Sequence, residues 1–346
     1  MAANNQDLLA IETKIKQVNL PVALRTNIEI KISQLDKLSG TENFLAELDR
    51  LNSYVDWIVN LPWQNRTKDI LDLDYAKKVL DNHHYGLTEI KDRIFEYISV
   101  MKLKGADNKE IARAPILCFV GLVGTGKTTI ASSIAEAMGR KFARIPFGGM
   151  GDPLDLRGQS RMHPEAEPGK IIKALRTAGS KNPVILLDEI DRVTTEGRSS
   201  IMGVLVELLD PGQNFAFVDH YIDFPFDLSE VLFIATANNT TNIATAVLDR
   251  LEPIQMPSYT DQEKVTIAKN YVLPKKMKEA RLTDTQLVFD EGVWPLMVRP
   301  LGFDAGIRTL ERTIDGVVRK VAREIVEGKE KSVKLSPLNA KQYLPQ

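Results

Sequence analysis

Cysteine is nearly absent from this sequence, which contains Cys118 and no other cysteine. One thiol cannot form an internal disulfide, so a packed core must hold the fold, as is usual in a reducing compartment. No run of about eighteen apolar residues occurs, which excludes a membrane-spanning helix. The first ten residues lack the basic start and apolar centre of a signal peptide, and Asp7 and Glu12 are unlike a transit peptide. The sequence therefore predicts a cytoplasmic protein without a membrane partner.

An excess of charge of either sign is also missing, because 45 Lys and Arg residues oppose 46 Asp and Glu residues. Balanced charge gives no indication of a nucleic-acid partner. The four histidines show no spacing typical of a metal site. The remaining composition, with 43% hydrophobic and 26% charged residues, is that of an ordinary globular chain long enough for two or three domains.

The apolar pattern changes twice along the chain. Up to residue 103 it is helical, and the predicted helices lie around residues 8–18, 44–59, 74–82 and 87–103, followed by a polar surface connection at 104–110. Short continuous apolar runs then predict buried parallel strands at 115–120, 141–145, 184–187, 231–236 and 253–256. After Pro257 we expect no further strands, but helices at 260–271, 291–298 and 304–327. The expected divisions are a helical segment 1–63, an α/β domain 64–257, a helical domain 258–330 and a tail or linker 331–346.

The segment Gly121–Thr128 has the pattern of a phosphate-binding loop, placed between a predicted strand and a helix. Its glycines, Gly121, Gly124 and Gly126, let backbone amides turn toward phosphate oxygens at a helix N-terminus. In this pattern Lys127 reaches the outer phosphates of ATP and the Thr128 hydroxyl holds Mg²⁺. Thr125 and Thr129 complete the predicted nucleotide site. The alternative is a glycine-rich turn that binds no ligand.

Two further strand ends carry polar residues that suit ATP hydrolysis. Asp188 and Glu189 follow a buried run, which would put Asp188 beside the metal ion and Glu189 beside the attacking water. Asn238 ends the run 231–237 and is a candidate to orient that water, although a turn role is the simpler alternative. Arg250 and Arg308 are candidates to stabilise charge on the γ-phosphate. For each arginine the alternative is a surface ion pair. If Arg250 acts on a neighbouring subunit, the chain must assemble head to tail.

Taken in order, these motifs resemble the ATPase module of the Lon protease family. The resemblance covers about residue 10 to the end, and it also includes Leu61–Trp63, Tyr85–Leu87, Asp188–Asp191, Phe217–Tyr221 and Ala305–Arg308. It implies an AAA+ αβα domain with a parallel sheet of strand order 5-1-4-3-2 and a small α-helical lid. It further implies a homohexameric ring with ATP or ADP and Mg²⁺ between subunits. By matching positions Asn238 is sensor 1, Arg250 the arginine finger and Arg308 sensor 2, and Tyr85 lies near the adenine.

The sequence departs from that family in the segment that grips substrate in the central pore. There the family has an aromatic, an aliphatic and a glycine residue, whereas this chain has His163-Pro164-Glu165. The loop also has Leu122-Val123 in place of the family's Pro-Pro, and Thr125 in place of Val. The family's serine-lysine protease domain would begin near Gln346, so we expect it to belong to a longer chain if it is present.

The first hypothesis is a Lon-type motor that unfolds and translocates protein substrates for proteolysis. The alternative is a nucleotide-switched assembly module that moves no substrate.

Overall fold

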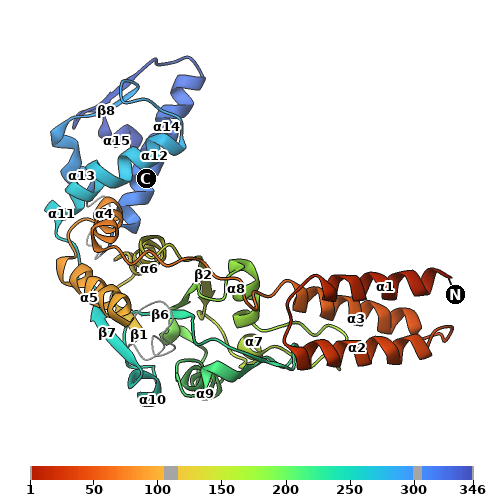
Figure 1. Ribbon diagram of the computed structural model, residues 1–346. Helices are drawn as coiled ribbons and strands as arrows, with labels where there is room; N and C mark the ends of the chain where they lie inside the picture. The colour runs from red at the N-terminus through yellow and green to blue at the C-terminus, as the bar shows by residue number, and fades with distance from the viewer. Residues whose placement is uncertain (1, 105–115, 299–305, 345–346) are drawn as a thin grey trace.

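The computed structural model describes residues 2–104, 116–298 and 306–344 and shows three parts in sequence. A helical bundle extends from one side of a central α/β domain, and a smaller lid rises from the other side (Figure 1). The predicted connection at 104–110 lies, after Lys104, outside the described residues. No helix in the described part is long and apolar enough to cross a membrane.

Three helices form the N-terminal bundle, which is packed through one apolar core. They are α1 (Ala2–Lys16), α2 (Val22–Lys37) and α3 (Phe44–Val59). No helix was predicted over the residues of α2. Its buried residues Leu24, Ile28, Ile32 and Leu35 recur at helical spacing, so the signal for this helix was present.

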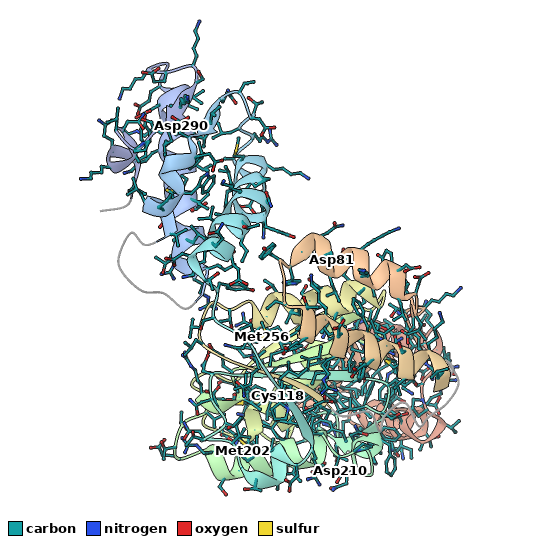
Figure 2. The ribbon with its side chains drawn as sticks, turned by 90° about the vertical axis from the view of Figure 1, so that its left-hand side faces the viewer. Asp81, Cys118, Met202, Asp210, Met256 and Asp290 are labelled. Carbon is teal, nitrogen blue, oxygen red and sulfur yellow. The ribbon has the colours of Figure 1, made fainter. Side chains whose placement is uncertain are left out.

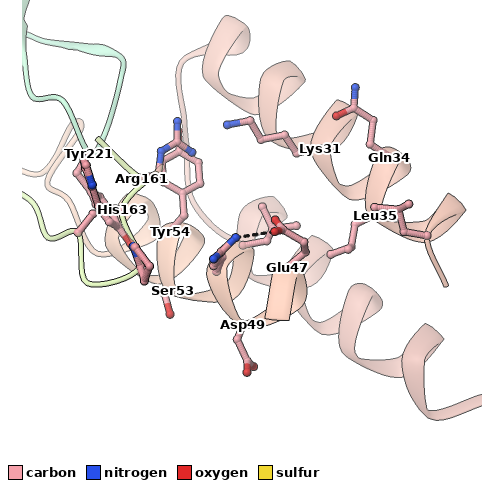
Figure 3. A pocket seen from close by; sticks show the side chains of 15 residues that line it. Lys31, Gln34, Leu35, Glu47, Asp49, Ser53, Tyr54, Arg161, His163 and Tyr221 are labelled. Atoms are coloured by element: carbon pink, nitrogen blue, oxygen red, sulfur yellow. Dashed lines mark hydrogen bonds and ion pairs between the residues drawn. The ribbon is translucent and has the colours of Figure 1, made fainter. Parts of the chain in front are cut away.

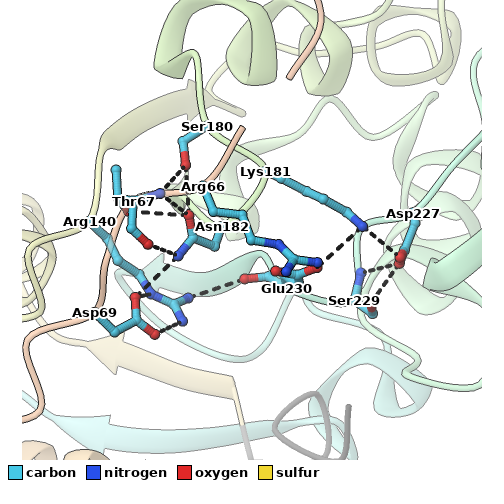
Figure 4. Close-up of polar contacts among 10 residues, drawn as sticks. All are labelled: Arg66, Thr67, Asp69, Arg140, Ser180, Lys181, Asn182, Asp227, Ser229 and Glu230. Carbon is cyan, nitrogen blue, oxygen red and sulfur yellow. Dashed lines mark hydrogen bonds and ion pairs between the residues drawn. The ribbon is translucent and has the colours of Figure 1, made fainter. Parts of the chain in front are cut away.

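The segment after the bundle is fixed to the α/β domain by buried polar contacts (Figure 4). Asn182 donates to the Thr67 carbonyl and accepts from the Thr67 amide, at 2.9 Å each. Asp69 forms a two-point ion pair with Arg140, whose side chain is 5% exposed. Paired donors and acceptors of this kind stabilise burial of polar groups because none is left without a partner. The chain therefore enters the α/β domain along a defined path.

A five-stranded parallel sheet forms the centre of the α/β domain. Its order is β2-β3-β6-β1-β7, which is the predicted order 5-1-4-3-2 read from the other edge once the five strands are numbered along the chain. The strands are β1 (Ile116–Val120), β2 (Phe142–Pro146), β3 (Val184–Asp188), β6 (Leu232–Ala237) and β7 (Leu251–Gln255). The predicted parallel sheet and its strand order are thus confirmed.

Helices cover both faces of the sheet because alternate strand residues point to opposite sides. Leu117 and Phe119 pack under α4 (Leu73–His83), α5 (Thr88–Lys104) and α6 (Lys127–Ala137). Cys118 and Val120 join the core of the other face, and Cys118 is fully buried. That face carries α7 (Leu154–Arg157), α8 (Lys170–Ala178), α9 (Arg198–Leu208), α10 (Thr245–Leu248) and a small hairpin of β4 (Phe217–Val218) and β5 (Pro225–Phe226).

The lid follows Met256. Figure 2 shows this residue at the end of the sheet that is nearest to the lid. The Thr260 capping box is present, and Pro274, which lacks an amide hydrogen, follows a π-helical turn at Ala268–Val272. The lid helices are α11 (Asp261–Ile267), α12 (Leu273–Glu279), a 3₁₀ turn (Glu291–Val293), α13 (Trp294–Val298), α14 (Arg308–Val326) and α15 (Ala340–Tyr343). The last long helix thus begins at Arg308, later than predicted.

Two expectations about the C-terminal part were wrong. Strands do not stop after Pro257, because β8 (Leu287–Phe289) pairs in parallel with β9 (Val333–Leu335). The residues expected to form a tail instead complete the lid core, in which Val333, Leu335 and Tyr343 are buried. Their burial removes apolar surface from water, which a free tail would leave exposed. Strands of three residues are too short to give a periodic signal.

Candidate active site

The loop Gly121–Thr128 connects β1 to α6 and surrounds the N-terminal end of that helix. Gly124 and Gly126 have φ angles of 85° and 95°, in the left-handed region where glycine is favoured. A Cβ atom on Gly121 would lie 2.8 Å from the Met256 Cβ. The chain therefore passes from β1 into the loop at Gly121, a position where a side chain does not fit. The amides of the first turn of α6 face the cleft, which is an arrangement that suits phosphate.

Lys127 is the first residue of α6 and is 7% exposed. Its Nζ atom donates to the carbonyls of Gly121 (2.6 Å) and Leu122 (3.0 Å) and to Asn238 Oδ1 (3.1 Å). Burial lowers the pKa of Lys127, and the nearby carboxylates of Glu189, Asp191 and Asp188 oppose that shift. Within residues 2–104, 116–298 and 306–344, no carboxylate forms an ion pair with this buried ammonium, which is therefore well suited to an anionic ligand.

Asp188 ends β3 and lies opposite Thr128, with 3.4 Å between Asp188 Oδ1 and Thr128 Oγ1. The same oxygen accepts a hydrogen bond from the Thr236 hydroxyl. The other carboxylate oxygen accepts from Arg144 Nε at 2.7 Å and Nη2 at 2.6 Å. Two oxygens from two elements thus converge beside the loop, and a pair of protein oxygens completed by phosphate is the usual environment of Mg²⁺.

Glu189 has a φ of 58°, an uncommon backbone conformation for a residue with a side chain. The Glu189 amide donates to Thr236 Oγ1 at 2.9 Å, which anchors this conformation to the next strand. The carboxylate lines the cleft together with Lys127 and Asp188, and Arg192 Nη1 lies 3.5 Å from it. Strained backbone of this kind is concentrated at functional sites, where it sets the direction of a side chain.

Asn238 follows β6, beside Lys127. Its Oδ1 atom accepts from Lys127, whereas its Nδ2 atom is buried and finds no hydrogen-bond partner among the residues that the structure describes. A buried donor without a partner costs about 1–3 kcal/mol, so this amide is poised for an acceptor that enters the cleft. A water molecule or a phosphate oxygen fits that description.

Arg308 reaches this cleft from the lid. Ile307 donates its amide to the Gly124 carbonyl at 3.0 Å, so the start of α14 is bonded to the phosphate-binding loop itself. The backbones of Gly306 and Gly124 touch, because a Cβ atom on Gly306 would lie 2.5 Å from the Gly124 carbonyl carbon. Arg308 lines the cleft with Glu311, and no ion pair neutralises it within the described residues.

Arg250, in contrast, is remote from its own chain's cleft. It precedes β7, whose first residue, Leu251, pairs with Ile116 at the start of β1, whereas the phosphate-binding loop follows the end of β1. Five residues of strand separate the two points, or about 16 Å. Arg250 donates to Asp210 Oδ2 at 2.9 Å and to the Ala246 carbonyl at 2.7 Å. Figure 2 shows Asp210 at the end of the domain that faces away from the lid.

Of the remaining predicted residues, Thr125 and Thr129 belong to the loop or its helix, whereas Tyr85 does not line the cleft. The hydroxyls of Thr125 and Thr129 bond to the Leu122 and Gly126 carbonyls and stabilise the turn. Tyr85 is not among the residues that line the cleft; it packs half-buried against the lid core. Tyr259, which was not among the predicted site residues, donates its hydroxyl to the Thr125 carbonyl at 3.3 Å. No motif singles out Tyr259, because it is placed by the turn into the lid. Burial raises its pKa to about 12.

The loop 158–169, which holds His163-Pro164-Glu165, has a narrow, glycine-lined base. A Cβ atom on Gly158 would lie 2.7 Å from the Gly169 amide nitrogen. Asp219, buried and central to the segment Phe217–Tyr221, accepts amide hydrogens from Gly169 (2.7 Å), Tyr221 (2.8 Å) and Ile222 (3.0 Å). At the tip, Met162 is 90% exposed, and the three residues after it are exposed as well. Asp219 therefore fixes the base while the tip projects into solvent.

A parallel sheet of this order, with the cleft at the carboxyl end of β1 and a helical lid bonded to the loop, defines an AAA+ ATPase. A model of the ATPase family associated with various cellular activities matches residues 117–259, and a model of the Lon protease AAA+ ATPase lid domain matches residues 278–333. The chain belongs to the Lon protease family, in which it corresponds to the AAA+ ATPase module.

Relatives extend the match to both ends of the chain. It is 44% identical to Lon protease 2 of Thermus thermophilus and 42% identical to the Lon proteases of Lawsonia intracellularis and Heliobacterium modesticaldum. These alignments cover 98%, 98% and 99% of this chain but 43%, 40% and 41% of the relatives. The chain thus spans well under half the length of the curated relatives it matches.

Proposed function

We propose that this ATPase module binds ATP with Mg²⁺ in the cleft between the loop 121–128 and the lid, and uses hydrolysis to pull protein substrates. The observation that carries the proposal is that Lys127, Asp188, Glu189 and Arg308 line one cleft, while Asn238, after β6, is hydrogen-bonded to Lys127 beside it. An acid pair, two cations that form no ion pair in the described part of the chain, and a side-chain amide with an unused donor there are the groups that phosphoryl transfer to water needs.

Each side chain has a distinct part in this scheme. Glu189 accepts the proton of the attacking water, and Asn238 orients that water through its free Nδ2 hydrogens. Lys127 and Arg308 stabilise charge on the outer phosphate oxygens. Thr128 and Asp188 would hold magnesium, which when bound neutralises charge on the phosphates. Arg144 and Thr236 hold the Asp188 carboxylate in place through hydrogen bonds.

The position of Arg250 supports a ring in which neighbouring subunits share each ATP. Because the length of β1, about 16 Å, separates Arg250 from the loop of its own chain, Arg250 would contact a γ-phosphate bound to an adjacent chain. The proposed assembly is a homohexamer, as the family resemblance implies. A head-to-tail interface of this kind closes into a ring.

Proteolysis would require a peptidase domain beyond this chain. The relatives are named Lon protease, and more than half of their length lies outside the aligned region. In this proposal the motor feeds unfolded protein to that domain. The exposed tip of the loop 158–169 supplies the substrate contact, with Met162 as its most exposed apolar side chain.

One observation favours the rival function, a nucleotide-switched module that moves no substrate: the loop tip carries His163-Pro164-Glu165 in place of an aromatic grip. The rate of ATP hydrolysis measured with and without an unfolded protein distinguishes the two. A motor accelerates when substrate is present, whereas a rate that ignores every unfolded protein tested would favour the switch.

A further inference from the structure

A cavity of about 610 Å³ lies between the N-terminal bundle and the loop 158–169 (Figure 3). Helices α2 and α3 form one wall, and the loop with Tyr221 forms the other. It is separate from the ATP cleft and shares no lining residue with it. None of the roles proposed above for ATP hydrolysis explains it.

Two positive charges meet at one aromatic ring inside this cavity. Arg161 Cζ lies 3.9 Å from the centre of the Tyr54 ring, and Lys31 Nζ lies 5.0 Å from the same centre. The Tyr54 hydroxyl donates to the Ile222 carbonyl at 3.1 Å, so the ring is held in place. The cation–π contacts thereby fix both cations on a rigid support.

These two cations are poorly neutralised. Within the described residues, no carboxylate lies within ion-pair distance of Lys31, and Arg161 has Asp223 at 3.5 Å, a side chain that is 74% exposed. Burial lowers the pKa of Lys31, and the charge of Arg161 lowers it further. Holding like charges together is unfavourable, and an anion placed between them would relieve the repulsion.

The other lining residues restrict the ligand. Arg50 already pairs with Glu47 at 2.7 Å, and Gln34 and Asp49 point away from the centre of the cavity (Figure 3). Leu35, Leu51 and Pro164 add apolar surface. A site with two available cations and apolar walls fits one or two carboxylates on a flexible chain better than the repeated phosphates of a nucleic acid, which need a longer basic surface.

We infer that this cavity binds acidic side chains of an extended polypeptide, with Lys31 and Arg161 as the carboxylate ligands. The inference rests on the proposed function, because the polypeptide would be the substrate that passes the exposed tip at Met162–Glu165. It assigns to the bundle and the loop together a preference for Asp- and Glu-containing segments. Arg161 belongs to the loop and Lys31 to α2, so binding would also connect substrate to the position of the loop.

The test uses the full chain and two fluorescent, unstructured peptides of equal length that differ only in the replacement of every Glu by Gln. Fluorescence anisotropy at low ionic strength should show about tenfold tighter binding of the Glu peptide, the factor given by one charge-assisted hydrogen bond. The double variant Lys31→Gln with Arg161→Gln should bind both peptides equally. Lys37→Gln, an exposed change on the same helix but outside the cavity, should keep the preference.

Equal binding of both peptides by the unchanged protein would overturn the inference, and so would a preference for the Glu peptide that the double variant retains. The inference would also fail if a single-stranded oligonucleotide displaced the labelled Glu peptide at a lower concentration than unlabelled Glu peptide does. Thermal unfolding of the double variant verifies that it is folded. The proposed motor function is judged separately, by stimulation of ATP hydrolysis. An unfolded protein that stimulates hydrolysis without any preference for Glu refutes this inference alone.

Discussion

The contact between the lid and the phosphate-binding loop can be tested with one methyl group, by the substitution Gly306→Ala. The added Cβ would lie 2.5, 2.6 and 2.7 Å from the carbonyl carbon, oxygen and Cα of Gly124. Carbon atoms pack at about 3.5–4.0 Å, so the two backbones must separate by about 1 Å. No rotamer change relieves this overlap, because all three atoms belong to the main chain.

That separation would stretch the 3.0 Å bond from the Ile307 amide to the Gly124 carbonyl and displace Arg308 from the cleft. A misplacement of about 1 Å costs up to about 10²-fold in rate when a charge must meet a transition state. Residue 306 is not one of the apolar side chains that form the lid core, so the thermal unfolding temperature should change little. We expect a fall in kcat of roughly 100-fold with the fold retained.

Phosphate release under saturating ATP measures the rate, and a fluorescent ADP analogue measures nucleotide binding. Gly316→Ala is the matched control, because it lies in α14 of the same lid and its Cβ would meet nothing within 4 Å. In that helix alanine should stabilise by about 1 kcal/mol and leave the rate unchanged. Wild-type turnover by Gly306→Ala would refute the claim that this lid contact positions Arg308.

Three further predictions concern separate parts of the chain. Asp219→Asn replaces one of the carboxylate oxygens by an NH₂ group that faces amide donors, which weakens the base of the loop 158–169. The stimulation of ATP hydrolysis by unfolded protein should therefore fall more than the basal rate of hydrolysis. An unchanged ratio of the stimulated rate to the basal rate would contradict this. His84, whose pKa burial lowers to about 4, must stay neutral in the fold. Because the unfolded chain binds the proton near pH 6.5, stability should fall by ~3 kcal/mol from pH 6.5 to pH 4, and urea unfolding of His84→Asn should lack this part of the loss. Arg250→Ala and Lys127→Ala chains should each be inactive but regain hydrolysis when mixed, whereas no recovery would contradict a shared site.

The sequence predicted the parts of the fold that carry strong periodic or motif signals. The strand at 116–120, the glycine loop and the acid pair at 188–189 are local patterns whose meeting follows from parallel-strand topology. The expected sheet order came from family resemblance and is confirmed. The short β8 and β9 strands escaped detection because they acquire stability only by pairing residues that are 46 positions apart in the chain.

Side-chain partners were less accessible to prediction than motifs. The Arg144–Asp188 pair, the Tyr259 contact with the loop and the backbone contact of Gly306 with Gly124 depend on tertiary geometry that no spacing encodes. The segment Phe217–Tyr221 was a family signature without a stated role. The structure gives its Asp219 a physical task, the closure of the base of the loop 158–169.

The central claim is that this cleft hydrolyses ATP with Glu189 as the base, and Glu189→Gln tests it most directly. The substitution keeps the size of the side chain and the hydrogen bond from the backbone amide of residue 189 to Thr236 Oγ1, and it removes the carboxylate. Measured together, ATP binding should match the unchanged protein while turnover falls by about 10²-fold or more, the contribution expected of a general base. Turnover at the wild-type rate, with ATP bound, would contradict the account.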